Sequence, residues 1–311
     1  MLILLDVSFP VFALILCGYL AGRSGLLGPQ SARALNGFVY YFALPALLFG
    51  FTAEAPIAVI LNWPFIGAIL GASLVTYIAA IAVGWCLFGQ RLPVVGLSAL
   101  AGVFANTGYL GIPLFLTAFG PENVGPAIVA TVAVITVFVG GTIALLELNQ
   151  QERQPLLPTI WNVLAALAKN PLVSAPIIAL PFSFYAVELA SPISRFLDLL
   201  GSAAGPAALF AIGMSFVNRT VRARPSEIGA FVAIKICLHP LLTWIAVTFV
   251  FDMEPFWASS AILLSALPTA AVAFVVAQER QVYVEQVSGI IVVSTVASVF
   301  AVSALLIAFP A

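Results

Sequence analysis

Long apolar segments alternate with short polar stretches along the whole chain. A helix needs about 20 apolar residues to cross the hydrocarbon core of a bilayer. The pattern therefore predicts an all-α integral membrane protein with ten transmembrane helices. The ten expected spans are residues 5–22, 34–53, 65–89, 94–118, 124–147, 160–184, 196–217, 227–250, 256–278 and 286–309.

Composition supports a membrane protein and narrows the kinds of partner. Of the residues, 63% are hydrophobic and 7% are charged, a balance that a soluble domain would not tolerate. The net charge of -1 does not bear on nucleic acid binding, but the lack of a basic cluster with interleaved aromatics argues against a nucleic acid partner. Cys17, Cys86 and Cys237 stand far apart inside apolar runs, so we expect packing residues, no metal site and no cofactor.

The spans divide into two sets of five. The longest polar interruption, Glu147 to Pro158, predicts a cytoplasmic linker at 149–159 between repeats at 1–148 and 160–311. An odd number of spans in each half inverts the second half relative to the first, which is typical of secondary transporters. Three proline pairs share an offset of 161 residues and indicate an internal repeat: Pro10 with Pro171, Pro45 with Pro206, and Pro64 with Pro225.

Basic residues predict the orientation, because cytoplasmic loops of membrane proteins carry an excess of Lys and Arg. If both termini are periplasmic, only Arg195 among the loop residues falls on the outer side. We therefore expect a multi-pass protein of the bacterial inner (plasma) membrane with both termini in the periplasm. The basic residues then placed in the cytoplasm are Arg23, Arg33, Arg91, Arg153, Lys169, Arg219, Arg222, Arg224 and Arg280.

The fourth and ninth spans contain residues that interrupt helices. Proline removes a backbone donor and glycine lowers the cost of unwinding, so both spans should break into half-helices. The offset of 161 places the two interruptions at corresponding depth. The fourth span contains Asn106, Thr107, Gly108, Gly111 and Pro113, and the ninth contains Ser265, Pro268 and Thr269.

Two broken helices can form a site for an anion. The second half-helix of each span begins inside the membrane with unpaired N–H groups and a partial positive charge. Asn106 can cap one half-helix and donate its amide to a carboxylate, while Thr107 and Thr269 offer hydroxyls. The alternative is a plain proline kink, but the matched interruption in the ninth span favours a substrate site over a kink.

Ionisable groups inside the spans bear on energy coupling. Every Asp and Glu lies near a span end or in a loop, which disfavours a carboxylate relay. Lys235 and His239 are spaced i, i+4 in the eighth span. Lys235 either extends its ammonium to water at the membrane surface or has a functional charge. In the second case the ammonium offsets the negative charge of the substrate, or it stabilises the carbonyl groups of the unwound segment in place of a sodium ion. His239 is expected to be a packing residue with a backbone or hydroxyl partner.

Other classes of function fit less well. The sequence has no HExxH or GxSxG motif and no aspartate at membrane depth, so an intramembrane enzyme is disfavoured. An anion channel, or a sodium- or proton-coupled symporter for a larger amphipathic substrate, remains an alternative to a carrier of small organic anions. Only a carrier exchanges labelled substrate against a gradient.

Four motifs resemble the auxin efflux carrier family, bacterial branch. They are VYYFALPALLF (39–49), FANTGYLGIPLF (104–115), ALFAIGMSF (208–216) and LSALPTAAVAFVVAQE (264–279). Plant members have a proline directly before the Asn-Thr pair, whereas this chain has Ala105, and they often have a large loop where this chain has a short linker.

The resemblance implies an elevator-type carrier of organic anions in a lipid bilayer. Helices 4 and 9 would be broken and would cross, helices 1, 2, 6 and 7 would form a scaffold, and helices 3–5 and 8–10 would move. By this resemblance, Asn106 matches the substrate-contacting Asn of the family, and Pro268 matches the second crossover proline. The second helix, around Pro45, would form part of the scaffold wall that faces the site. The substrates implied range from auxin to malate and malonate, with a homodimer as one assembly.

Overall fold

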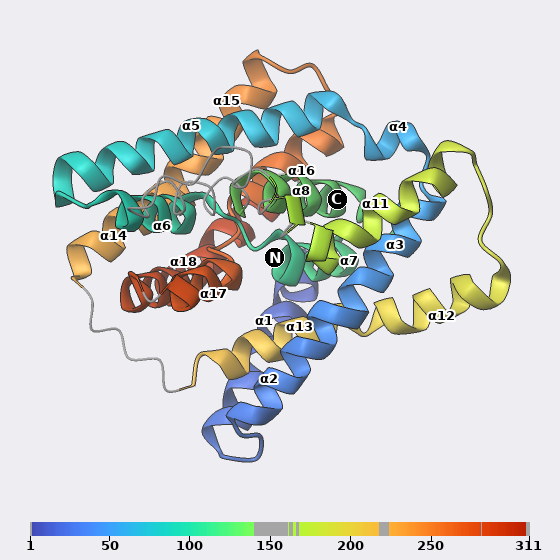
Figure 1. Ribbon diagram of the computed structural model, residues 1–311, viewed down its shortest axis with the longest axis horizontal. Helices are drawn as coiled ribbons and strands as arrows, with labels where there is room; N and C mark the ends of the chain where they lie inside the picture. Colours follow the sequence, from blue (N-terminus) through green and yellow to red (C-terminus); the bar gives the residue numbers. More distant parts are fainter. Residues whose placement is uncertain are drawn as a thin grey trace.

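The computed structural model describes residues 2–139, 161, 164–165, 168–217, 224–280 and 282–308. The predicted linker at 149–159 lies outside these ranges. Within them the chain is helical throughout, apart from turns and one isolated β-bridge (Figure 1). The all-α class predicted from the sequence is therefore confirmed.

The first half of the chain contains the helices up to residue 139. They are α1 (Leu2–Arg23), α2 (Pro29–Phe38), the π-helix η1 (Val39–Ala43), α3 (Leu44–Glu54), α4 (Ile57–Ile60), α5 (Trp63–Phe88), α6 (Leu92–Val103), the π-helix η2 (Thr107–Gly111), α7 (Ile112–Ala118), the 3-10 turn η3 (Pro121–Asn123), α8 (Gly125–Val134) and η4 (Ile135–Val139).

The described residues of the second half are also mostly helical. Its elements are α11 (Pro171–Phe184), α12 (Ser191–Ser202), α13 (Ala204–Ser215), α14 (Pro225–Ala233), the π-helix η5 (Ile234–Leu238), α15 (His239–Phe249), α16 (Pro255–Ser265), α17 (Ala271–Arg280) and α18 (Val284–Ala308).

The helices have the length and surface of membrane spans. Within the described chain, 6 helical stretches are long and apolar enough to cross a membrane, and five shorter apolar helices accompany them. Large side chains such as Leu87 and Phe300 are exposed on the outside, as expected for a surface that faces lipid. Cys17, Cys86 and Cys237 are also exposed, so they lie on the apolar surface and not in the core. In a membrane protein the core and the lipid-facing surface are equally apolar, and an apolar run does not distinguish them.

Three prolines explain three of the π-helical segments. Pro45, Pro113 and Pro240 each occupy the second position of an α-helix that directly follows a π-helix. Proline has no N–H, so it cannot continue the i to i−4 pattern. The residue before each proline instead bonds to the carbonyl five residues earlier, as in the bond from the Ile112 N–H to the Thr107 carbonyl. These prolines widen their helices and do not end them.

One group of helices combines both halves through close backbone contact. The helix α1 packs along α13, and α11 packs along α3 (Figure 1). A Cβ atom at Gly18 would lie 2.0 Å from the Phe210 carbonyl oxygen, and one at Gly213 would lie 1.9 Å from the Ile15 carbonyl oxygen. Glycine is therefore required at both positions for α1 and α13 to approach this closely.

The remaining helices form the other group. The long helix α5 packs against α6 and α15, α16 packs against α15 and α8, and α18 packs against α14 and α17. Fully buried aromatic side chains, including Phe65, Phe104 and Phe231, fill the space between them. The two interrupted spans lie inside this group, and η2 and α7 also contact α13 of the first group.

Candidate functional site

The two predicted interruptions are present, and they meet. The helix α6 ends at Val103 and α16 ends at Ser265, and the chain is not helical again until Thr107 and Ala271. Between these ends, Ala105 and Thr269 form an antiparallel bridge. The Asn106 N–H donates to the Pro268 carbonyl at 2.8 Å, and the Ala270 N–H donates to the Phe104 carbonyl at 2.9 Å. Backbone hydrogen bonds therefore hold the two breaks across each other.

Each break is followed by a helix with free N–H groups in its first turn. The helical stretch Thr107–Ala118 begins at the crossing, as does α17. Within the described part of the chain, the N–H groups of Gly108, Ala271 and Val272 have no hydrogen-bond partner. Free amides and the helix dipole favour an anion at such an end. The crossing thus brings two ends of this kind together.

Asn106 occupies the cap position but does not cap. Asn106 directly precedes η2, yet its side chain makes no capping hydrogen bond. The prediction that the Asn106 side chain caps the half-helix is therefore wrong. The backbone carbonyl of Asn106 takes over by accepting from the N–H groups of Leu110 and Gly111. With 6% of its surface exposed, the Asn106 side chain is nearly enclosed at the crossing. Its amide is not used for capping and can serve a ligand.

Thr269 holds the crossing from the ninth span. Its hydroxyl donates to the Ala101 carbonyl at 2.6 Å, and its N–H donates to Ser294 Oγ at 3.1 Å. The Thr269 hydroxyl proton, which the sequence predicts to bind a ligand, therefore bonds instead to a carbonyl near the end of α6. The Ser265 hydroxyl is likewise committed, because it donates to the Ile262 carbonyl.

The glycines of the fourth span have different neighbours. At Gly111, a Cβ atom would lie 2.9 Å from Leu267 Cδ1, so this glycine lets the two breaks pack tightly. A Cβ atom at Gly108 would lie 3.3 Å from a methyl group of Thr131 on α8. Thr107 is buried beside them. The residues that we singled out in this span therefore surround the crossing.

Lys235 lies against the crossing and not at the membrane surface. Its side chain is 0% exposed, so it does not snorkel to water. The ammonium donates to the Ser265 carbonyl at 2.5 Å and lies 3.2 Å from His239 Nδ1. His239 Nε2 in turn lies 3.0 Å from Ser73 Oγ, which is the hydroxyl partner expected for this histidine. Because Ser265 is the last residue of α16, the cation meets the negative end of that helix dipole.

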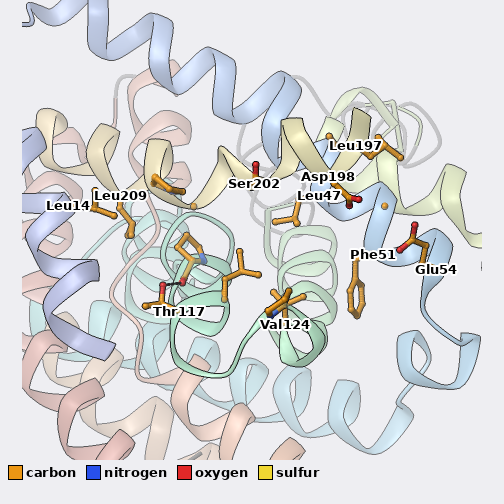
Figure 2. Close-up of a pocket in the computed structure, with 17 residues that line it drawn as sticks. Leu14, Leu47, Phe51, Glu54, Thr117, Val124, Leu197, Asp198, Ser202 and Leu209 are labelled. Atoms are coloured by element: carbon orange, nitrogen blue, oxygen red, sulfur yellow. Dashed lines mark hydrogen bonds between the residues drawn. The ribbon is translucent and has the colours of Figure 1, made fainter. Parts of the chain in front are cut away.

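A cavity opens between the two groups of helices. Its volume is about 540 Å³, and residues of α1, α3, α7, η3, α12 and α13 line it, together with Val124 before α8. Leu14 and Leu209 lie at one end and Glu54 at the other, with Asp198 between them on the Glu54 side (Figure 2). Pro113 and Thr117 place α7 on its wall. The other predicted site residues do not line this cavity, although Ala46, the residue after Pro45, does.

A second polar cluster was not foreseen from the sequence. Glu227, which is 7% exposed, accepts hydrogen bonds from Gln90 and from the Tyr283 hydroxyl, the latter at 2.7 Å. Ser98 donates to Gln90 Oε1 at 2.7 Å. Burial, and then the Glu227 carboxylate, raise the pKa of the Tyr283 phenol above its usual value. The cluster ties the start of α14 to the turns before α6 and before α18.

Comparison with known proteins identifies the class. Residues 4–306 match the family described as "Membrane transport protein". The chain is therefore a multi-pass membrane transporter, and it belongs to this family, the auxin efflux carrier family that its motifs resemble. The sequence-based recognition is confirmed.

Individual relatives share most of the length of the chain. A Rhizobium meliloti protein named "Putative malonate transporter" is 30% identical over 298 residues, covering 96% of this chain and 93% of that protein. The uncharacterized transporter YfdV of Escherichia coli K12 is 25% identical over 283 residues, covering 88% and 87%. The lysosomal cholesterol signaling protein of Mus musculus is 26% identical over 246 residues, covering 74% of this chain but 28% of that protein.

Proposed function

We propose that this transporter is a secondary carrier, not an enzyme, which moves a small organic anion by an elevator-type movement. The observation that carries the proposal is the crossing itself, where two helix N-termini with free amides meet beside the unused amide of Asn106. The name of the Rhizobium meliloti relative supports a small carboxylate such as malonate. An anion channel is the alternative.

The substrate carboxylate would bind at the start of the half-helix that follows the fourth-span break. Asn106 would donate its side-chain amide, and the free N–H groups of Gly108 and of the first turn of α17 would supply the rest. Pro268 and Thr269 would shape the site through the backbone bridge and the bond to Ala101. Gly108 and Gly111 would keep the space beside the carboxylate narrow.

The packing supports two inverted repeats of five helices, at 1–148 and 160–311. Under such a relation α1 corresponds to α11, and α3 to α13; α1 packs along α13 just as α11 packs along α3. The inverted relation also matches the contact between α5 and α6 in the first repeat to the contact between α15 and α16 in the second. We propose that α1 to α3 and α11 to α13 form the scaffold, and that α5 to α8 and α14 to α18 move along it.

Lys235 would act in place of a coupling cation. A sodium ion at a broken helix is held by unwound carbonyl oxygens, and here an ammonium occupies that role at the Ser265 carbonyl. Transport should then proceed without sodium. A proton would then be the candidate for a coupling ion. The expected location is the inner membrane, with both termini in the periplasm.

Counterflow in proteoliposomes tests the proposal. Vesicles loaded with unlabelled malonate should accumulate labelled malonate transiently, which a channel cannot produce. Asn106→Ala should raise the apparent Kd about tenfold or more, because a hydrogen bond to a charged group contributes roughly 1.5–3 kcal/mol. Asn62→Ala is the matched control, since Asn62 caps α5 through the Phe65 N–H, remote from the crossing. An unchanged affinity of Asn106→Ala would refute the site.

A further inference from the structure

We propose that the site takes its substrate as a singly charged anion, so that a dicarboxylate binds with one carboxyl ionised and the other protonated or neutral. The inference rests on the proposed function and specifies its substrate class. Two independent features carry it: the charge held at the crossing, and the charge along the cavity beside it.

The crossing carries one positive side chain. Each break ends a helix whose last carbonyl groups need hydrogen-bond donors. At the end of α6 the donor is the neutral Thr269 hydroxyl, and at the end of α16 it is the Lys235 ammonium. Both acceptors of Lys235, the Ser265 carbonyl and His239 Nδ1, are uncharged groups. The partial positive charges of the two helix N-termini at the crossing are balanced by the partial negative charges at the ends of α6 and α16. The arrangement therefore supplies one net positive charge and not two.

Acidic and basic groups on the neighbouring helices do not change this balance. Among the described residues, the Glu and Arg side chains on or just before the elements that pack around Lys235 lie at helix ends: Glu227 in the first turn of α14, Glu254 before α16, Glu285 in the first turn of α18 and Arg91 before α6. Within the spans these elements also carry the titratable groups of His239, which contacts Lys235, and of Tyr77 on α5. No carboxylate of the described chain forms a hydrogen bond with Lys235.

A single negative charge matches this site. A buried charge is tolerated when an opposite charge compensates it, and an excess charge in a medium of low dielectric constant is strongly disfavoured. A monoanion beside Lys235 leaves the crossing neutral. A dianion leaves one uncompensated negative charge in the membrane.

The cavity adds a second bias in the same direction. Glu54 and Asp198, both exposed, line it, and Figure 2 shows their carboxylates toward one end. The cavity follows α7, the helix that leads back to the crossing, through Thr117 and Pro113. Coulomb repulsion scales with the charge of the solute, so a potential that depletes a monoanion by some factor depletes a dianion by the square of that factor.

Malonate and its monoamide separate the two charge states. The monoamide keeps one carboxylate and replaces the other with a neutral group of similar size. At pH 8 malonate is a dianion, whereas near pH 5 a substantial fraction is singly charged. We expect the purified protein to bind the monoamide about tenfold more tightly than malonate at pH 8, and the difference to shrink to a few-fold at pH 5.

Variants of the cavity provide the second arm. The double variant Glu54→Gln, Asp198→Asn should raise the initial rate of malonate uptake at pH 8 relative to that of the monoamide. Glu188→Gln, which removes one negative charge from an exposed residue that does not line the cavity, should leave the ratio unchanged, whereas the single variants Glu54→Gln and Asp198→Asn should each raise it. Equal affinities for malonate and the monoamide at pH 8 would overturn the inference and leave the proposed function intact. Binding of neither compound at either pH would instead refute the carboxylate site itself.

Discussion

Replacing Thr269 with valine tests how the two breaks hold each other. Valine has nearly the shape of threonine but cannot donate, so the substitution deletes the bond to the Ala101 carbonyl and changes little else. Ala101 is fully buried, so water cannot replace the lost donor. A buried acceptor left without a partner costs about 1–3 kcal/mol.

The loss should be visible as a lower midpoint of thermal unfolding. For a chain of this size, 1 kcal/mol corresponds to roughly 2–4 °C, so the expected decrease is of the order of 2–12 °C. Intrinsic tryptophan fluorescence of the purified protein in detergent can follow the transition. Thr269→Ser, which keeps the hydroxyl and removes only a methyl group, should lose less than Thr269→Val.

Thr243→Val is the matched control. The Thr243 hydroxyl is equally buried and donates to the His239 carbonyl, one turn earlier in the same helix. Within a helix that carbonyl keeps its backbone partner, so the same chemical change should cost less there. If Thr269→Val unfolds at the wild-type temperature, or no earlier than Thr243→Val, the Thr269 hydroxyl does not hold the crossing.

Three further predictions concern charge, pH and topology. Lys235→Gln should reduce malonate transport at least tenfold, normalised to protein in the membrane, because a charge-assisted hydrogen bond contributes about 1.5–3 kcal/mol. Lys235→Arg should keep part of the activity. Near-normal flux through Lys235→Gln would exclude a role for the charge. The raised pKa of Tyr283 keeps its phenol neutral in the folded protein, so its contribution to stability is present below about pH 10 and is lost above it as the unfolded chain ionises. Tyr283→Phe should therefore flatten the fall in unfolding temperature between about pH 9 and 11, and an unaltered slope would contradict this reading. A cysteine introduced after Pro310, in a variant without the three native cysteines, should react with an impermeant maleimide in intact spheroplasts; labelling only after permeabilisation would reverse the orientation.

Local chemistry in the sequence is enough to predict where the helices break. Asn106 and Pro268 mark the interruptions because glycine, proline and side-chain polarity act within a few residues of the chain. The same reasoning singles out Lys235, since an ammonium inside an apolar run has few ways to be satisfied. It does not reveal that Lys235 would meet the Ser265 carbonyl.

Partners that are distant in the chain are the part that sequence patterns miss. The bond from Thr269 to Ala101 and the cluster of Gln90, Glu227 and Tyr283 depend on how whole helices pack. Hydrophobic periodicity cannot supply that information, because lipid and protein neighbours are equally apolar. For the same reason the apolar run around Cys86 does not reveal that this residue is exposed.

The contact between α1 and α13 also constrains how the protein is made. Gly18 of the first helix is matched to Phe210, a residue that is synthesised after the whole first half of the chain. When the first half enters the membrane, the face of α1 that carries Gly18 has no packing partner until α13 has been synthesised and inserted. Neither half is then a folding unit in its own right. Two separately expressed halves should be unstable alone and should assemble when they are produced in the same membrane.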